Sequence, residues 1–199
     1  DLLSGKVLNR TNLEPGQRPI LLAGGLILAG TTVAEAVRLD AYALSSPGAP
    51  GVLKWRTKAD PDWALASPKD RFQPLVGDGF LAVPLRDGFA LLDPKTGEVI
   101  CRKSNGNQPA LANPSGGILI GGDEGDTECY DARGVIRWRA EGFWAFAATT
   151  RYVAGFRHAA WSEDQQNSYL LIDAATGECR GRAESFPYGM GHRVALSGE

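Results

Sequence analysis

The sequence shows no assembled set of catalytic side chains. His158 and His192 are the only histidines, and they do not have the spacing of metal ligands. A nucleophilic serine would need a base beside it and a sharp turn to present it, yet no Gly-x-Ser-x-Gly motif occurs. We therefore predict no catalytic, metal-binding or cofactor-binding residues and no cofactor, and we favour a protein that is not an enzyme.

The densest group of acids lies at positions 123–128, where four carboxylates fall within six residues. Carboxylate oxygens in such a group could hold a hard cation. The positions lack the spacing of an EF-hand loop, and a turn between two strands is normally polar. We interpret this segment as a solvated turn.

Composition limits the class of partner. The formal net charge is −2 and Lys and Arg are not clustered, so we expect no nucleic-acid partner. Apolar residues make up 43% of the chain, which is too many for a disordered protein. The longest apolar run, 20–29, is interrupted by two glycines and is shorter than the roughly 18 residues of a membrane helix, so we expect no membrane span. The chain opens with Asp1 and without a signal peptide, which indicates a processed product or an excised piece.

Three cysteines, Cys101, Cys129 and Cys179, show no Cys-x-x-Cys spacing. We expect them to be small buried apolar residues, and the alternative is one disulfide between neighbouring strands.

One short unit recurs along the chain and must position everything else. It opens with an aspartate and reaches a glycine three or four residues later, at Asp1 and Gly5, Asp93 and Gly97, Asp131 and Gly134, and Asp173 and Gly177. A further copy keeps Gly51 but has a longer turn before it. The glycines are 46, 46, 37 and 43 residues apart, which suits one four-stranded propeller blade per interval.

The chemistry of the unit is that of a turn between two antiparallel strands. The aspartate can accept hydrogen bonds from backbone amides just ahead of it, and the glycine can take the positive φ that closes the loop. An apolar residue stands two positions after each glycine, and the alternation from the glycine onward predicts a half-buried strand. Trp55 and Trp138 stand at the fourth position, where a large flat ring could face the next sheet. We interpret the aspartates, glycines and tryptophans of the unit as structural.

These patterns predict an all-β fold, a β-propeller of four-stranded antiparallel blades, in a single partial domain over residues 1–199. The blades are expected at 1–10 (last strand only), 18–57, 71–103, 108–140, 143–183 and 190–199 (first strand only). About four of them are complete, and exposed sheet edges favour closure into a larger ring of seven or eight blades. The alternative is that residues 1–10 pair with the terminal strand to complete a fifth blade.

The unit Asp-x-x-Thr-Gly-x-x-x-Trp, preceded by apolar runs such as Phe89–Leu92 and Tyr169–Ile172, resembles the PQQ-like repeat. That repeat builds quinoprotein dehydrogenases and BamB-type outer-membrane assembly scaffolds. The resemblance covers essentially the whole chain, although the Trp position is kept only at Trp55 and Trp138. The dehydrogenases have two adjacent cysteines beside the cofactor, and no two cysteines are adjacent here, so the resemblance implies the fold without PQQ. Relatives of this repeat often work outside the cytoplasm, which leads us to expect a periplasmic or cell-surface protein of a bacterium.

Two long loops, 56–71 and 157–167, lie on the face where we expect binding, because loops of this length are often functional. Trp63 and Trp161 lie in these loops, where an exposed ring could anchor a peptide or sugar. The alternative is a ring packed onto its own blade. We expect a non-catalytic binding or scaffold module that recruits a protein or peptide through this loop face. The alternatives are a fragment of a PQQ-dependent dehydrogenase and a sensor of small ligands or sugars. The candidate partner-binding residues are Trp63, Arg86, Trp144, Arg157, His158, Trp161 and Tyr188.

Overall fold

The computed structural model describes residues 12–23, 25–44, 51–64, 74–104, 108–113, 117–121, 126–157 and 168–184. Within these residues every regular element is a β-strand, and no helix is present that could cross a membrane. The partial blades expected at 1–10 and 190–199 lie outside the described residues.

The described residues contain sixteen strands in four separate sheets of four, each an antiparallel meander in chain order. The first sheet contains β1 (Arg18–Ala23), β2 (Leu26–Val33), β3 (Ala36–Ala43) and β4 (Val52–Arg56). The second contains β5 (Leu75–Gly77), β6 (Phe80–Leu85), β7 (Gly88–Leu92) and β8 (Val99–Lys103). The third contains β9 (Gln108–Asn113), β10 (Gly117–Gly121), β11 (Thr127–Asp131) and β12 (Ile136–Ala140). The fourth contains β13 (Phe143–Ala148), β14 (Tyr152–Arg157), β15 (Ser168–Asp173) and β16 (Cys179–Glu184).

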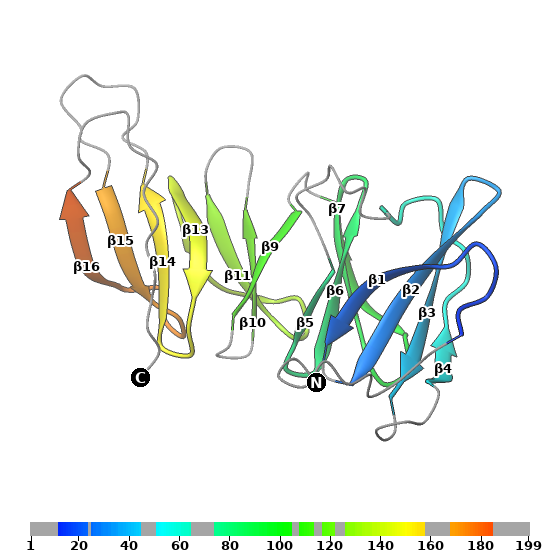
Figure 1. The fold of residues 1–199 in the computed structure, drawn as a ribbon. Coiled ribbons are helices and arrows are strands. Elements are labelled where there is room, and N and C mark those ends of the chain that lie inside the picture. Colours follow the sequence, from blue (N-terminus) through cyan, green and yellow to red (C-terminus); the bar gives the residue numbers. More distant parts are fainter. Residues whose placement is uncertain are drawn as a thin grey trace.

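The sheets stand side by side in chain order, face against face (Figure 1). The first strands of the later sheets contact one another, β5 with β9 and β9 with β13, so these strands lie on the inside of the arc. This is the arrangement of propeller blades around an axis. The all-β prediction with four-stranded antiparallel blades is therefore confirmed.

The apolar core is divided into layers between neighbouring sheets. One cluster joins the first and second sheets, another joins the second and third, and another joins the third and fourth. An inner sheet therefore buries both faces, and β6 and β7 are buried at every residue. This explains why these strands read as continuous apolar runs without alternation.

The repeated aspartates close the turns between the third and fourth strands. The Asp93 carboxylate accepts hydrogen bonds from the amides of Lys95 and Thr96, at 2.6 and 3.3 Å. Asp173 does the same for Ala175 and Thr176, at 3.0 and 3.1 Å. The amide of Thr176 lowers the pKa of Asp173 because it stabilises the ionised carboxylate.

The same turns lock one sheet to the next. The Trp55 indole on β4 donates a hydrogen bond to the Pro94 carbonyl in the turn of the second sheet, at 2.9 Å, and its ring lies against Gly97. Trp138 on β12 repeats this with the Ala174 carbonyl at 3.1 Å and with Gly177. Between the second and third sheets the smaller Cys101 takes the place of the ring, and its sulfur lies against Gly134. Each contact joins the last strand of one sheet to the turn of the following sheet.

The simple alternation predicted after the glycine is wrong, because a β-bulge interrupts it. In all four sheets the pairing of the last two strands skips the third residue after the glycine, and the skipped residues are Lys54, Ile100, Arg137 and Arg180. The bulge rotates the strand between the second and fourth positions. Leu53, Val99 and Ile136 are consequently exposed although Trp55 and Trp138 are buried.

The different burial of the three cysteines follows from the same strand geometry. Cys129 on β11 is buried, Cys101 is half-buried, and Cys179 is exposed because it occupies the second position after its glycine, before the bulge. None of the three is in a disulfide. The expectation that all three are buried is wrong for Cys179.

The outer face of the first sheet carries a hydrogen-bonded charged network, beside Ile27, Ala29 and Tyr42. Asp40 on β3 has no exposed surface, and its carboxylate accepts hydrogen bonds from Arg56, at 2.8 and 3.0 Å, and from Arg38 at 3.2 Å. Gln17 also donates to Asp40, and Glu14 pairs with both arginines at 2.9 and 2.6 Å. The hydrogen bond from Arg56 lowers the pKa of Glu14. Residues next to Asp40 along β3 point to the opposite face, toward the second sheet, so this network covers the side that faces away from the other sheets.

We expect Gly97→Ala to destabilise the protein more than Gly79→Ala. Both glycines have positive φ, 75° and 78°, so both variants lose about 1–2 kcal/mol to backbone strain. Only at Gly97 does a Cβ also meet the Trp55 ring, at 2.6 Å, which adds about 1–3 kcal/mol of overpacking. Urea unfolding measures the two losses, and equal values would show that the indole does not depend on this glycine.

Asp40→Asn is expected to lower the free energy of unfolding by about 1.5–3 kcal/mol, because the hydrogen bonds of two arginines lose a charged acceptor. Asp62→Asn is the matched control. Asp62 is largely exposed and lies 3.6 Å from Arg102, so its loss costs less than about 1 kcal/mol. If thermal and urea unfolding show the same loss in free energy of unfolding for both variants, the Asp40 network does not stabilise the first sheet.

Candidate protein-interaction face

The structure separates the candidate partner-binding residues. Trp63 is 3% exposed and packs in the core between the first and second sheets. Its backbone forms an isolated antiparallel β-bridge with Leu85 of β6. The Arg102 guanidinium lies 5.8 Å from the centre of the Trp63 ring. Of the two interpretations of Trp63, the packed one holds, and its ring is not available as a surface anchor.

The other candidates lie on different sheets or outside the described residues. Arg86 is exposed in the β6–β7 turn, where its amide donates to the Asp62 carbonyl at 2.8 Å. Arg157 ends β14 and pairs with Phe143, whereas Trp144 pairs with Phe156. Alternation therefore places the Arg157 and Trp144 side chains on opposite faces of the fourth sheet. His158, Trp161 and Tyr188 lie outside the described residues.

Trp144 belongs to an aromatic row that the sequence did not reveal. The strand register places Trp144, Phe156 and Tyr169 opposite one another across β13, β14 and β15. Phe156 and Tyr169 meet edge to face at 5.6 Å, and Phe146 meets Tyr169 at 6.4 Å. Trp144 is 54% exposed and Phe146 is 41% exposed.

This row lies on the face of the fourth sheet that points away from the third. Phe143, Val153, Leu170 and Ile172 pack against the third sheet, and the residues that alternate with them point the other way. We name this surface the aromatic face and define it by Trp144, Phe146, Ala154, Phe156, Tyr169, Leu171, Gly181 and Ala183. A β-bulge in β13, between Ala145 and Ala147, marks the position of Phe146.

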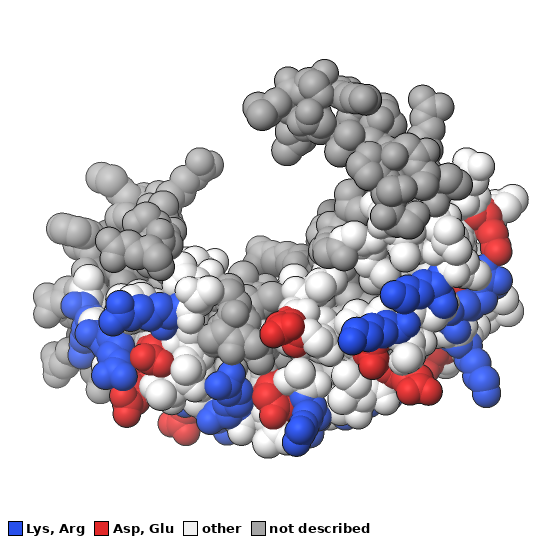
Figure 2. All heavy atoms as spheres, turned by 90° about the horizontal axis from the view of Figure 1, so that it is seen from below, with Lys and Arg blue, Asp and Glu red and all other residues white. Residues whose placement is uncertain are grey.

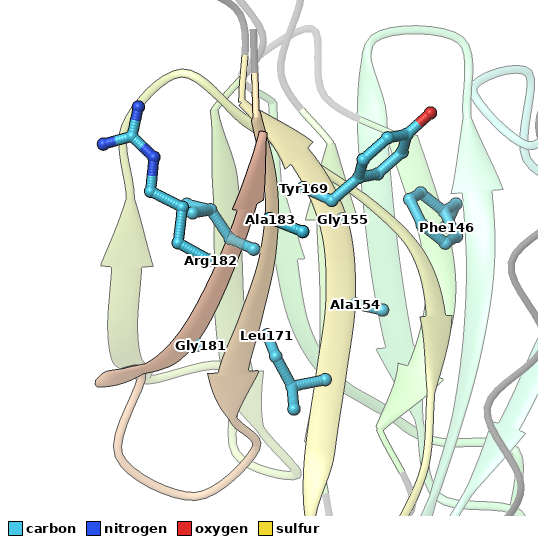
Figure 3. A pocket seen from close by; sticks show the side chains of 9 residues that line it. Phe146, Ala154, Gly155, Tyr169, Leu171, Gly181, Arg182 and Ala183 are labelled. Atoms are coloured by element: carbon cyan, nitrogen blue, oxygen red, sulfur yellow. The ribbon is translucent and has the colours of Figure 1, made fainter. Parts of the chain in front are cut away.

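A pocket of about 260 Å³ opens on the aromatic face. The Phe146, Tyr169 and Leu171 side chains lie on one side of the sheet, while the Arg182 side chain extends to the other side of β16 (Figure 3). Gly181 and Ala154 leave the pocket open because their side chains are small. The arrangement suits an aromatic or aliphatic side chain, which would lose water and contact apolar carbon on several sides.

Charged side chains are arranged differently. Seen from below, the described residues form an arc whose outer rim carries basic and acidic residues interspersed with each other (Figure 2). On β12, Arg139 pairs with Asp126 at 2.5 Å and lies 3.7 Å from Glu128. In the part of the chain that the structure describes, no group of three or more His, Cys, Asp or Glu side chains could hold a metal ion.

Consecutive four-stranded meanders around an axis define the class of this protein, which is a β-propeller. Solved structures with a similar fold include a europium-containing methanol dehydrogenase, at 13% identity and a TM-score of 0.50 over 90% of this chain and 42% of that one. BamB from Moraxella catarrhalis is similar at 13% identity and a TM-score of 0.46, over 91% of this chain and 64% of that one. The N-terminal domain of Nup159 is similar at 14% identity and a TM-score of 0.49, over 92% of this chain and 46% of that one.

This chain thus spans less than two thirds of each of these relatives. At such identities the likeness shows the fold alone. No protein-family model matches the sequence, and no curated protein matches it.

Proposed function

We propose that this chain is a non-catalytic binding module to which a protein partner docks through the aromatic face of the fourth sheet. The supporting observation is that Trp144 and Phe146 are exposed on the same face as Phe156 and Tyr169. Phe146 and Tyr169 also line the pocket on this face. Exposed aromatic rings clustered on a rigid sheet supply large contact area at a low cost in conformational entropy, and such rings dominate binding at protein interfaces.

The proposal moves the binding surface from the loops to a sheet face. Arg86 and Arg157 remain predictions for a partner contact on the loop face. We also propose that the repeat is of the PQQ-like type, on the strength of the Asp-x-x-Thr-Gly turns at Asp93 and Asp173. Membership of that group would place the protein outside the cytoplasm of a bacterium. No observation on the described residues favours the dehydrogenase or sugar-sensor alternatives.

The double variant Trp144→Ala with Phe146→Ala is expected to lose at least about tenfold in affinity for the partner, because truncation of each buried aromatic contact costs more than about 1 kcal/mol. Its thermal stability should change little, because Trp144 is 54% exposed and Phe146 is 41% exposed in the free protein. Capture of partners by the immobilised protein, followed by titration of the captured protein, measures the loss.

Val135→Ala with Ile136→Ala is the matched control. These side chains are also exposed and apolar, but Ile136 begins the last strand of the third sheet and Val135 directly precedes it. The control should bind as the unaltered protein does. If the Trp144 and Phe146 variant also binds without loss, the aromatic face is not the binding site.

A further inference from the structure

In each of the first three sheets, the residues equivalent to part of the aromatic face pack against the following sheet. A register row crosses each sheet and packs against the following sheet. The rows run through Leu28, Ala41 and Trp55 in the first sheet, through Ala82, Leu91 and Cys101 in the second, and through Leu119, Cys129 and Trp138 in the third. All nine residues belong to the apolar clusters between sheets. The corresponding row of the fourth sheet is Ala154, Leu171 and Gly181, and it lines the pocket.

The tyrosine on the aromatic face has a counterpart as well. Phe89 and Tyr169 both stand four residues before the aspartate of their turn, Asp93 or Asp173. In the second sheet this ring meets Tyr130 of the third sheet edge to face, at 5.2 Å. The aromatic face thus corresponds, position by position, to the faces that form the interfaces between neighbouring sheets.

We propose that the aromatic face docks a further antiparallel four-stranded sheet, placed next around the same axis, which inserts a bulky apolar side chain into the pocket over Gly181. This inference rests on the proposed function, because it specifies the partner of the same surface. The occupant is a blade of the kind seen here, with an apolar row facing the preceding sheet as Leu81, Val83 and Leu92 do in the second sheet.

At this face the incoming sheet would supply the large side chain, whereas in the first and third sheets the preceding sheet supplies it. In the first and third sheets the row ends in a tryptophan that lies against the glycine turn of the next sheet. In the fourth sheet Gly181 occupies that position and leaves space instead of a ring. The large side chain must therefore come from the incoming sheet, since an unfilled apolar cavity would forfeit packing contacts.

The first sheet of a second copy does not fit as the occupant. Its outward face carries Asp40, Arg38, Arg56 and Glu14 in a hydrogen-bonded network. Docking this network on apolar rings would remove exposed charges from water without providing new partners for them. The occupant needs an apolar face, and the outward face of the first sheet carries this charged network beside Ala29 and Tyr42.

Site-specific photo-crosslinking tests the inference. A benzoylphenylalanine in place of Ala183, on the aromatic face, is irradiated in the protein as its cell produces it, and the crosslinked residues are identified by mass spectrometry. We expect crosslinks to alternate residues of one strand, within a segment that repeats the aspartate-to-glycine turn. Gly181→Trp should fill the pocket and lower the crosslink yield at least fivefold, and Gly181→Leu should lower it less.

Gly181→Ala is the matched control and should leave the yield unchanged, because an added Cβ meets only the Leu171 Cβ, at 3.7 Å. Circular dichroism verifies that each variant keeps its sheet content. Crosslinks to a helix, to a segment without the strand pattern, or to the first sheet of a second copy would overturn the inference. So would a yield that Gly181→Trp leaves unchanged or raises.

The two proposals fail in different ways. If Trp144→Ala with Phe146→Ala abolishes partner capture but the crosslinks fall outside a blade, only the identity of the partner is wrong. If that variant captures partners normally and Ala183 yields no crosslink, the aromatic face does not bind a protein and both proposals are wrong.

Discussion

The structure depends on a single repeated contact, in which the last strand of one sheet packs against the glycine turn of the next. In the described residues no strand of one sheet pairs with a strand of another. The relative position of the sheets therefore depends on side chains and, between the first two sheets, on the segment 60–64, whose backbone is hydrogen-bonded to Val37 of β3 and to Pro84 and Arg86. The Trp55 indole supplies both parts of this contact, a hydrogen bond to a turn carbonyl and a flat ring over Gly97. The aspartate that holds the turn closed is therefore as necessary to the stacking of sheets as the ring itself. A turn residue and a core residue some forty positions apart act as one unit.

The sequence contained enough information for the architecture because this contact has a periodic signature. Aspartates, glycines and apolar runs recur at blade-length intervals, and the four complete sheets follow from that recurrence. The bulge in the last strand could not be read from it. The apolar residues Val99 and Ile136 look like core residues by type, and only the skipped residue that follows them in the pairing turns them outward. Bulges arise from strand pairing, and pairing partners are not encoded in the spacing of one strand.

At the candidate site, the sequence did not predict which tryptophan is exposed. Trp63 follows two aspartates and Trp144 lies in an apolar run, yet Trp63 is buried and Trp144 is exposed. Burial of Trp63 follows from a bridge to Leu85, more than twenty residues later. Exposure of Trp144 follows from its face of β13, together with the register that brings Phe156 and Tyr169 beside it. Both outcomes depend on long-range pairing, which a length of loop does not predict.

The two outermost faces of the arc differ in a way that bears on assembly. The first sheet turns a charged network outward, in which Asp40 loses all contact with water but keeps two arginine partners. The fourth sheet turns aromatic rings and a pocket outward. In arrays of repeats, a polar outer face ends the stack and an apolar face continues it, because each unit buries its surface only against a neighbour. Packing of these two faces on each other would join unlike surfaces. Under the two proposals, a further sheet would have to bring an apolar face to the fourth sheet, and Trp144 and Tyr169 would form part of the surface that recognises it.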